Sequence, residues 1–409
     1  MGAMSKTDIL VVGAGLSGLL AAVALSEPEH GADQAVTLID PGPLDPNASP
    51  SGNRTDLRET SLTPSAVRML RRLGLDLPPL SAMRGMRVGE GRADAPWQFQ
   101  LDAPEGEALA HFINNDILKD HLLKRASDLG VALLGGRSVR ALAIDGSAHV
   151  TLDNGETSSA SLIVAADGRN SAVRQLAGIG MTERSFDQHT LILTALHRNP
   201  HEGIALERFQ SVGAIGSLPL LDDEQGRHRS QIAWSDRSEA VMAAGHLSSN
   251  AISALIDERL WNQLGIYDVM GSRQAYPLSA RRADTITSER IALVGDAART
   301  IHPLAGLGFN LGIRDIAALS DGVRNAARVG QDIGMAGLLD YARWRQMDAT
   351  LVTALTEGLS AAPRSNPAGR LLGHARRAVF AGVNTVPGLQ SLIRLEAGGE
   401  IGTRPPLLH

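Results

Sequence analysis

The sequence predicts an α/β fold in which a Rossmann-like sheet carries an inserted, mainly antiparallel β-sheet and is followed by a helical C-terminus. Three observations favour this fold. Short apolar runs at residues 8–12, 161–165 and 291–294 each end in a turn that contains glycine, as expected where strands of a parallel sheet end. Four spaced apolar runs between residues 190 and 234 indicate an antiparallel sheet. After Gly312 the pattern is mostly helical to the end of the chain.

Composition indicates a globular protein and excludes several functions. The 409 residues are 43% hydrophobic and 20% charged, and this length suits two or three domains. The net charge of −5 argues against nucleic acid as a partner. The absence of cysteine excludes disulfides, thiolate catalysis and Cys-based metal sites, and it suits a reducing cytoplasm. We expect no metal centre and no segment that spans a membrane.

The first motif is Gly13-x-Gly15-x-x-Gly18, between an apolar strand at 8–12 and a helix at 19–25. In this spacing one glycine allows the turn, one lets the backbone approach a pyrophosphate, and one permits close packing of helix on strand. A second strand, 35–39, ends in Asp40, about 20 residues further on, where an acid can bind ribose hydroxyls. The alternative for Asp40 is a turn residue before Pro41. Together these features predict dinucleotide binding.

A second polar edge follows the strand at 161–165. Asp167 and Gly168 end this strand, and Arg174 follows on a helix start. The structural alternative is a helix N-cap formed by Asn170 or Ser171.

A third edge follows the strand at 291–294. Gly295 and Asp296 stand at its carboxyl end, where open α/β sheets bind ligands. Gly306 and Gly308 let the backbone approach a ligand closely, and a helix begins at Phe309. Unpaired N–H groups at that helix start favour negative charge. The edge therefore suits a large, polyhydroxylated, partly anionic cofactor.

The sequence pattern also predicts the other helices and strands of the chain and its division into domains. Helices are expected at 64–73 and 115–129, and a helix-rich part at 238–264. Strands are expected at 86–88, 97–101, 109–113, 131–134, 139–144, 150–152, 190–196, 205–209, 213–218 and 230–234. The expected domains are the cofactor domain (5–83, 111–180 and 277–358), the substrate domain (84–110 and 181–276) and C-terminal helices (359–409). Arginines among apolar residues of this tail suit either a membrane-surface helix or a solvated packing helix.

In combination the three motifs resemble the class A flavoprotein monooxygenases, which have the para-hydroxybenzoate hydroxylase fold. The run from Gly295 to Asp315 is close to that of the ubiquinone-biosynthesis hydroxylase branch, and so are Glu207-Arg208-Phe209 and Tyr276-Pro277-Leu278. The resemblance covers roughly residues 7–360. The chain departs from the branch at Arg299, where histidine is usual, and at Leu307, where glutamine is usual.

The resemblance implies FAD as the cofactor and NADH or NADPH as the co-substrate, and it implies roles for individual residues. Gly13, Gly15 and Gly18 would cradle the FAD pyrophosphate, and Asp40 would bind the adenosine ribose. Arg58 and Asn115 would contact FAD, while Gly295 and Asp296 would serve its ribityl or pyrophosphate side. Gly306, Gly308, Phe309 and Asn310 would lie at the flavin pyrimidine, and Asp167, Gly168 and Arg174 would serve the FAD pyrophosphate and NAD(P)H. His302 and Pro303 would flank the ring near the substrate; a purely structural histidine is the alternative for His302.

The implied activity is hydroxylation of an aromatic ring with NAD(P)H and O2, on a polyprenylated phenol intermediate of ubiquinone biosynthesis. Such a substrate implies a cytoplasmic enzyme that contacts the inner membrane peripherally, a lipid-carrier protein or a biosynthetic complex. Two alternatives stay open: a class A hydroxylase of another aromatic compound, and a catalytically silent FAD-binding scaffold.

Overall fold

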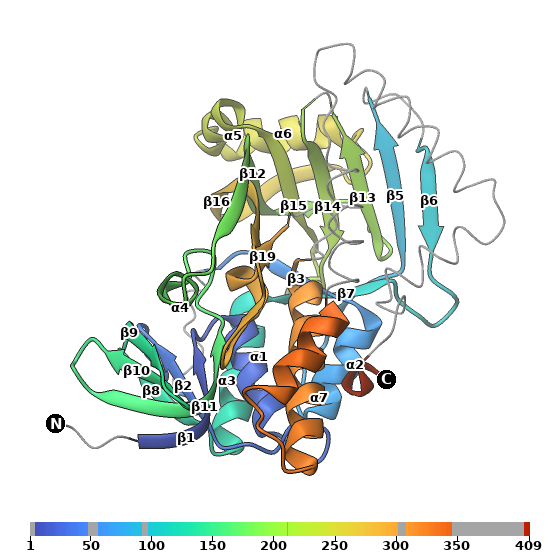
Figure 1. Ribbon diagram of the computed structural model, residues 1–409. Coiled ribbons are helices and arrows are strands. Elements are labelled where there is room, and N and C mark those ends of the chain that lie inside the picture. The colour runs from blue at the N-terminus through green and yellow to red at the C-terminus, as the bar shows by residue number, and fades with distance from the viewer. Residues whose placement is uncertain (1–4, 48–55, 92–96, 211, 302–307, 346–404) are drawn as a thin grey trace.

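The computed structural model describes residues 5–47, 56–91, 97–210, 212–301, 308–345 and 405–409 (Figure 1). The described chain forms two eight-stranded sheets and a three-stranded sheet. We refer to these as the first sheet, the second sheet and the small sheet. Figure 1 shows the first sheet with its helices in the lower half of the molecule and the second sheet above it.

The first sheet is built around five parallel strands. Their order is β18 (Ile291–Leu293), β11 (Thr157–Ala165), β1 (Ser5–Val12), β2 (Val36–Asp40) and β8 (Ala132–Gly135). Three strands extend it with antiparallel pairing: β17 (Thr287–Ser288), β10 (Ala148–Leu152) and β9 (Val139–Ile144). Successive residues Ile9, Leu10 and Val11 of β1 are all buried. Both faces of this strand are therefore covered, which explains why it is apolar without alternation.

Helices cover one face of the first sheet. They are α1 (Leu16–Ser26), α2 (Pro64–Arg72), α3 (Asn115–Asp128) and α7 (Gly308–Arg328), and their apolar residues share one core with β1 and β11. The short α4 (Ala172–Leu176) packs against β9 on the other face. Thr63 and Asn114 accept backbone N–H groups as the N-caps of α2 and α3. Ser171 does the same for α4, so the N-cap expected beside Asp167 is present.

The second sheet is mainly antiparallel. Its order is β19 (Arg299–Thr300), β16 (Ile266–Ala283), β12 (Met181–His197), β15 (His228–Arg237), β14 (Ala214–Pro219), β13 (Ile204–Phe209), β5 (Gly85–Glu90) and β6 (Phe99–Asp102). Only the pair of β13 with β5 is parallel. The helices α5 (Ser238–Gly245) and α6 (Ser249–Arg259) share an apolar core with one face of this sheet.

The small sheet consists of β3 (Glu59–Leu62), β7 (Ala110–Asn114) and β4 (Ser81–Met83). β7 lies in the middle and leads directly into α3. It lies between the two larger sheets in Figure 1. The start of α3 is therefore held at the junction of the larger sheets.

The predicted fold class is confirmed, and the structure adds a long strand. The sequence pattern does not predict the long strand β16. Few of its residues are buried, and buried and exposed residues do not alternate regularly along it. It contains Pro277, which is tolerated because β19 pairs only with Arg281 and Arg282 and leaves this part of β16 without a strand on that side. The expected C-terminal helices lie outside the described residues, apart from a short 3-10 helix at Pro406–Leu408. None of the helices described in the structure has the length and apolar character needed to cross a membrane.

Candidate functional site

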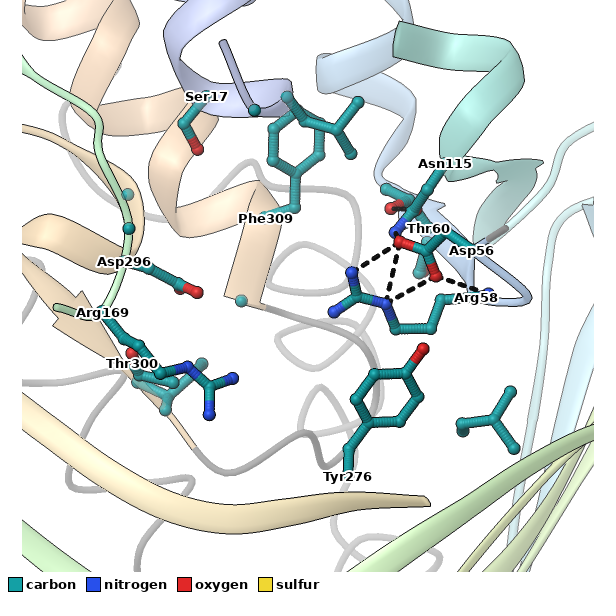
Figure 2. Close-up of a pocket in the computed structure, with 18 of the residues that line it drawn as sticks. Ser17, Asp56, Arg58, Thr60, Asn115, Arg169, Tyr276, Asp296, Thr300 and Phe309 are labelled. Carbon is teal, nitrogen blue, oxygen red and sulfur yellow. Dashed lines mark hydrogen bonds and ion pairs between the residues drawn. The ribbon is translucent and has the colours of Figure 1, made fainter. Parts of the chain in front are cut away.

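A cavity of about 640 Å³, here called the main cavity, lies where the first, second and small sheets meet (Figure 2). Its size is in the range of cofactor pockets. Three helices begin at its wall, and the residues that line it there include Gly15 and Ser17 at α1, Asn115 at α3, and Gly308 at α7. The carboxyl ends of β11 and β18 supply Ala166 and Gly295.

The starts of α1 and α7 are suited to an anionic ligand. Neither helix has an acidic residue in its first turn, and Gly15, the N-cap of α1, offers no side chain to the free N–H groups. The first N–H groups of a helix have no partner within the helix and carry partial positive charge. A ligand phosphate at the main cavity can accept hydrogen bonds from them.

The three motif glycines differ in their surroundings. A Cβ at Gly13 would lie 2.5 Å from the carbonyl oxygen of Ala166, and a Cβ at Gly18 would lie 1.7 Å from that of Gly13. These two glycines therefore allow backbone segments to touch. A Cβ at Gly15 would meet no protein atom within 4 Å, and Gly15 lines the main cavity. Gly15 thus leaves room for a ligand rather than for the protein itself.

Arg58 projects into the main cavity beside an acidic and an aromatic side chain. Its Nε and Nη2 donate to the two carboxylate oxygens of Asp56 at 2.8 and 2.5 Å, and its guanidinium lies 5.0 Å from the ring centre of Tyr276. Asn115 donates to Asp56 at 3.0 Å and accepts a hydrogen bond from Thr60. Figure 2 shows this group on one side of the cavity.

This group is strongly polarised. The hydrogen bond to Asp56 raises the pKa of Arg58, which stays charged. Burial alone would raise the pKa of Asp56, but its hydrogen bonds with Arg58 and Asn115 outweigh burial and hold the pKa below its usual range. Burial raises the pKa of Tyr276, so its hydroxyl stays protonated. The site therefore presents a fixed cation next to hydroxyl and amide groups.

Asp296 and Arg169 line the main cavity on the side opposite Arg58 (Figure 2). Asp296 is accessible, but its accessible surface faces the cavity rather than open solvent. Burial raises the pKa of this carboxyl, and the positive charges of Arg169, Arg58 and Arg281 partly oppose that rise. Asp296 can accept hydrogen bonds from ligand hydroxyls, while Arg169 can pair with a ligand anion.

Three of the predicted site residues brace the loops around the main cavity and are not among the residues that line it. The Asp40 carboxylate accepts the backbone N–H of Ala14 at 2.6 Å, behind the glycine motif. Asp167 accepts the N–H of Val173 at 3.1 Å in α4. Arg174 is buried and donates to the carbonyl of Ala297 at 3.3 Å. Direct contact of these three with a cofactor remains a prediction.

Asn310 also faces the protein. Its side chain accepts the backbone N–H of Thr63 at 3.0 Å and donates to the carbonyl of Ser61 at 2.7 Å. It therefore ties the start of α7 to β3 and α2. Its neighbours Gly308 and Phe309 line the main cavity, as does Gly168.

Three predicted residues, His302, Pro303 and Gly306, lie outside the described part of the chain, and so does Leu307. Arg299, the other departure from the family pattern, is described and is not among the residues lining the main cavity. It is buried and lies 3.3 Å from the carboxylate of Asp315. This departure therefore affects a buried ion pair rather than the cavity surface.

Sequence reasoning did not assign roles to Asp56, Tyr276 or Arg169, which all line the main cavity. Two signals were available. Tyr276 precedes Pro277 in a run that resembles the family, and Arg169 follows Asp167-Gly168 directly. The strand β16 that carries Tyr276 was not expected, so nothing in the sequence placed its hydroxyl beside Arg58.

A smaller cavity of about 210 Å³, here called the side chamber, adjoins the main cavity and shares Arg58, Glu59, Ser61, Thr190 and Ile192 with it. Its wall is largely apolar. An apolar cavity of about 150 Å³ can hold benzene, so the side chamber has room for a substituted aromatic ring. Its other lining residues are Met83, Met86, Phe112, Ala205, Leu206, Glu207, Ala214, Gly216, Leu218, Gln231, Ala233 and Ser235.

Comparison with known proteins identifies the family. Residues 6–353 match the family model described as FAD binding domain. The chain is 32% identical to the ubiquinone hydroxylase UbiL of Rhodospirillum rubrum, over 98% of this chain and 92% of that protein. It is 30% identical to the 3-demethoxyubiquinol 3-hydroxylase of Escherichia coli, over 83% of this chain and 85% of that protein.

Solved structures agree on the fold. The p-nitrophenol 4-monooxygenase PnpA from Pseudomonas putida superposes with a TM-score of 0.75 at 18% identity, covering 98% of this chain and 100% of that chain. PqsL from P. aeruginosa superposes with a TM-score of 0.73 at 18% identity, covering 93% and 100%. The chain belongs to the FAD-binding-domain family and is an FAD-dependent monooxygenase.

Proposed function

We propose that this enzyme hydroxylates the ring of a polyprenylated phenol intermediate of ubiquinone biosynthesis. The observation that carries this proposal is the apolar side chamber, which adjoins the main cavity and has room for a substituted ring. Relatives that are 32% and 30% identical over most of the chain are named ubiquinone hydroxylase UbiL and 3-demethoxyubiquinol 3-hydroxylase. An apolar wall favours a substrate whose substituents are hydrocarbon.

We further propose which residues hold FAD in the main cavity. Gly15 and the start of α1 would take the pyrophosphate, because the backbone there is open and its N–H groups are free. Asp296 would accept hydrogen bonds from cofactor hydroxyls, and Arg58 would lie at the flavin. Bound FAD supplies the redox chemistry that transfers one oxygen atom from O2 to the ring. The protein orients the ring beside it and excludes water.

Retention of FAD tests the proposed cofactor site. Asp296→Ala should lose the flavin visible spectrum after gel filtration, because the variant lacks an acceptor inside the cavity, while its melting temperature without FAD should not fall. Burial already disfavours the ionised carboxyl of Asp296 in the folded protein. Flavin occupancy equal to that of the unchanged protein would count against this role.

Turnover tests the proposed substrate. The FAD-loaded protein is given NADH or NADPH with a short-chain prenyl phenol, or with the same phenol lacking the prenyl group. Substrate-stimulated NAD(P)H oxidation, with a product that has gained one oxygen atom, should be faster for the prenyl phenol. Faster turnover of the unprenylated phenol would favour a hydroxylase of another aromatic compound. Retained flavin with no stimulated oxidation by either probe would favour a scaffold role.

The proposed substrate has a consequence for where in the cell the enzyme would work. A polyprenylated phenol is poorly soluble in water, so the enzyme would take it from the cytoplasmic face of the inner membrane, from a lipid-carrier protein or within a biosynthetic complex. The basic C-terminal segment, which suits either a membrane-surface helix or a solvated packing helix, lies outside the described residues. Co-sedimentation of the full chain with anionic and with neutral vesicles distinguishes membrane contact from delivery by a protein.

A further inference from the structure

One acidic side chain of the side chamber has no place in the cofactor site described above. Glu207 lies in β13, between β14 and β5, and is paired with Gly216 and Val88. On the next strands of the second sheet, Gly216 is paired with Ala233, and Ala233 is paired with Ile192. Gly216 and Ala233 have small side chains, so the sheet surface is hollow next to Glu207. A Cβ at Gly216 would come no closer than 3.7 Å to another atom.

The other polar side chains that the second sheet contributes to the side chamber are already paired. Thr190 and Ser235 share a hydrogen bond of 2.7 Å between their hydroxyls. Gln231 donates to the carbonyl of Leu57 at 2.7 Å. Within the described part of the chain, the Glu207 side chain makes no hydrogen bond or ion pair. It is therefore the group on this wall that still lacks a partner.

Charges near Glu207 are few. Among the residues lining the side chamber, only Arg58 and Glu59 also carry charge, and Arg58 is engaged by Asp56. The strands β4, β5, β7, β12, β14 and β15 contribute uncharged side chains to the lining. Burial accordingly raises the pKa of Glu207 to about 7, with no countercharge opposing it. An unpartnered carboxyl in such a place costs stability unless a ligand supplies a hydrogen-bond donor.

We propose that Glu207 is the specificity residue of the side chamber: its carboxylate accepts a hydrogen bond from a hydroxyl on the substrate ring. This role rests on the proposed function and narrows its substrate class. A phenol supplies the donor that Glu207 lacks, and the small residues beside it leave space for the ring. An aromatic carboxylate would bring a second negative charge beside Glu207, and Arg58, the cation among the described lining residues, is already paired with Asp56. The chamber therefore selects phenols over ring carboxylates.

The test measures binding to the FAD-loaded protein through the change in flavin absorbance on titration. The probes are a short-chain prenyl phenol, its O-methyl ether, and the same phenol carrying a ring carboxylate. The variants are Glu207→Leu, which removes the acceptor, and Glu207→Gln, which removes the charge. Glu202→Gln is the matched control, because Glu202 is exposed in the turn before β13 and does not line either cavity.

The unchanged protein should bind the phenol at least about tenfold more tightly than either the ether or the carboxylate, the usual effect of a hydrogen bond to a charged group. Glu207→Leu should reduce the phenol-to-ether preference to near one, and Glu202→Gln should keep it. Affinity for the phenol should rise with pH through about 7 in the unchanged protein and stay flat in Glu207→Gln, because only the ionised carboxyl is the strong acceptor.

Three results would overturn the inference. The first is a phenol-to-ether preference that survives in Glu207→Leu while the enzyme still turns over the phenol; the proposed function would then stand alone. The second is equal binding of phenol and carboxylate by the unchanged protein. The third is the absence of any response to the prenyl phenol in a protein that retains FAD, which would remove the proposed function together with the role of Glu207.

Discussion

Gly13, Gly15 and Gly18 belong to one motif, but each meets a different physical demand. Gly13 has a φ of +100°, in the region that favours glycine, and touches the segment at Ala166. Gly18 lies where a helix meets the preceding turn. Gly15 has ordinary extended backbone and open space in front of it. Two of the glycines therefore serve the fold, and one serves the ligand.

The same substitution at two of these glycines should have opposite effects. Gly15→Ala should cost less than about 1 kcal/mol of stability, as expected for an exchange at an N-cap, but it should weaken FAD binding at least about tenfold by pushing the phosphate off the N–H groups. Gly18→Ala should cost about 3 kcal/mol through overpacking. Urea unfolding of the FAD-free proteins and FAD titration separate the two. Unchanged FAD affinity in Gly15→Ala would overturn the assignment of the pyrophosphate to α1.

Glu207 should make stability depend on pH. Its pKa is about 7 in the folded protein and near 4.5 when unfolded, so the folded state holds this proton more tightly. Below pH 4.5 the carboxyl is protonated in both states and there is no penalty; between pH 4.5 and 7 the penalty grows to about 3 kcal/mol, and above 7 it is constant. Glu207→Gln should therefore gain stability over the unchanged protein at pH 8 and little at pH 5.

Urea unfolding at pH 5 and pH 8, without ligand, checks this prediction. Glu202→Gln serves again as the control and should show no difference between the two pH values, because Glu202 is exposed. A gain for Glu207→Gln of the same size at both pH values would mean that the carboxyl is not held away from water.

At the scale of elements, the site is made by helix starts. α1, α3 and α7 begin at the main cavity, and strands of the small sheet contact α3 and α7. Asn310 is a clear example, since it bonds to Thr63 and Ser61 rather than to the cavity. A buried amide with two backbone partners fixes where α7 begins relative to β3.

Removal of the Asn310 hydrogen bonds to Thr63 and Ser61 should destabilise the protein at the start of α7. Asn310→Ala leaves a buried N–H at Thr63 and a buried carbonyl at Ser61 without their partner, which should cost about 2–4 kcal/mol in urea unfolding. Asn250→Ala is the matched control, because Asn250 is exposed near the start of α6, and it should stay within about 0.5 kcal/mol. Equal stabilities for the two variants would show that Asn310 does not brace α7.

Sequence patterns predicted these elements where the signal is local. The strand, glycine motif and helix around Gly15, and the helix start at Asn115, follow from apolar runs, turn residues and caps. The direction of a polar side chain is not local: Asp40 and Asn310 were expected to face the cofactor, and both bond to backbone groups of neighbouring segments. Strand β16 was missed because its exposed residues and Pro277 hide the alternation that marks a strand.

At the scale of the whole molecule, a buried ion cluster lies between the two large sheets. Arg299 of β19 lies 3.3 Å from Asp315 of α7, and Arg345, in the helical stretch 336–345, donates to the same carboxylate at 2.5 Å. The cluster therefore connects the edge of the second sheet to the helices of the first.

Asp315→Asn should destabilise the whole molecule rather than one element. The Asp315 side chain is fully buried, and Arg299 and Arg345 are nearly so. Removing the carboxylate charge leaves two buried guanidinium groups without a countercharge, a change that costs about 3–5 kcal/mol. Asp128→Asn is the control, because its pair with Lys124 is exposed and 3.8 Å long, and exposed pairs contribute about 1 kcal/mol or less. Urea unfolding should show a large loss of stability for Asp315→Asn and almost none for Asp128→Asn.

Bound FAD should restore part of the stability that Asp315→Asn loses, because Thr300, next to Arg299, lines the main cavity. Similar stabilities for the two variants would mean that the cluster does not hold the sheets together.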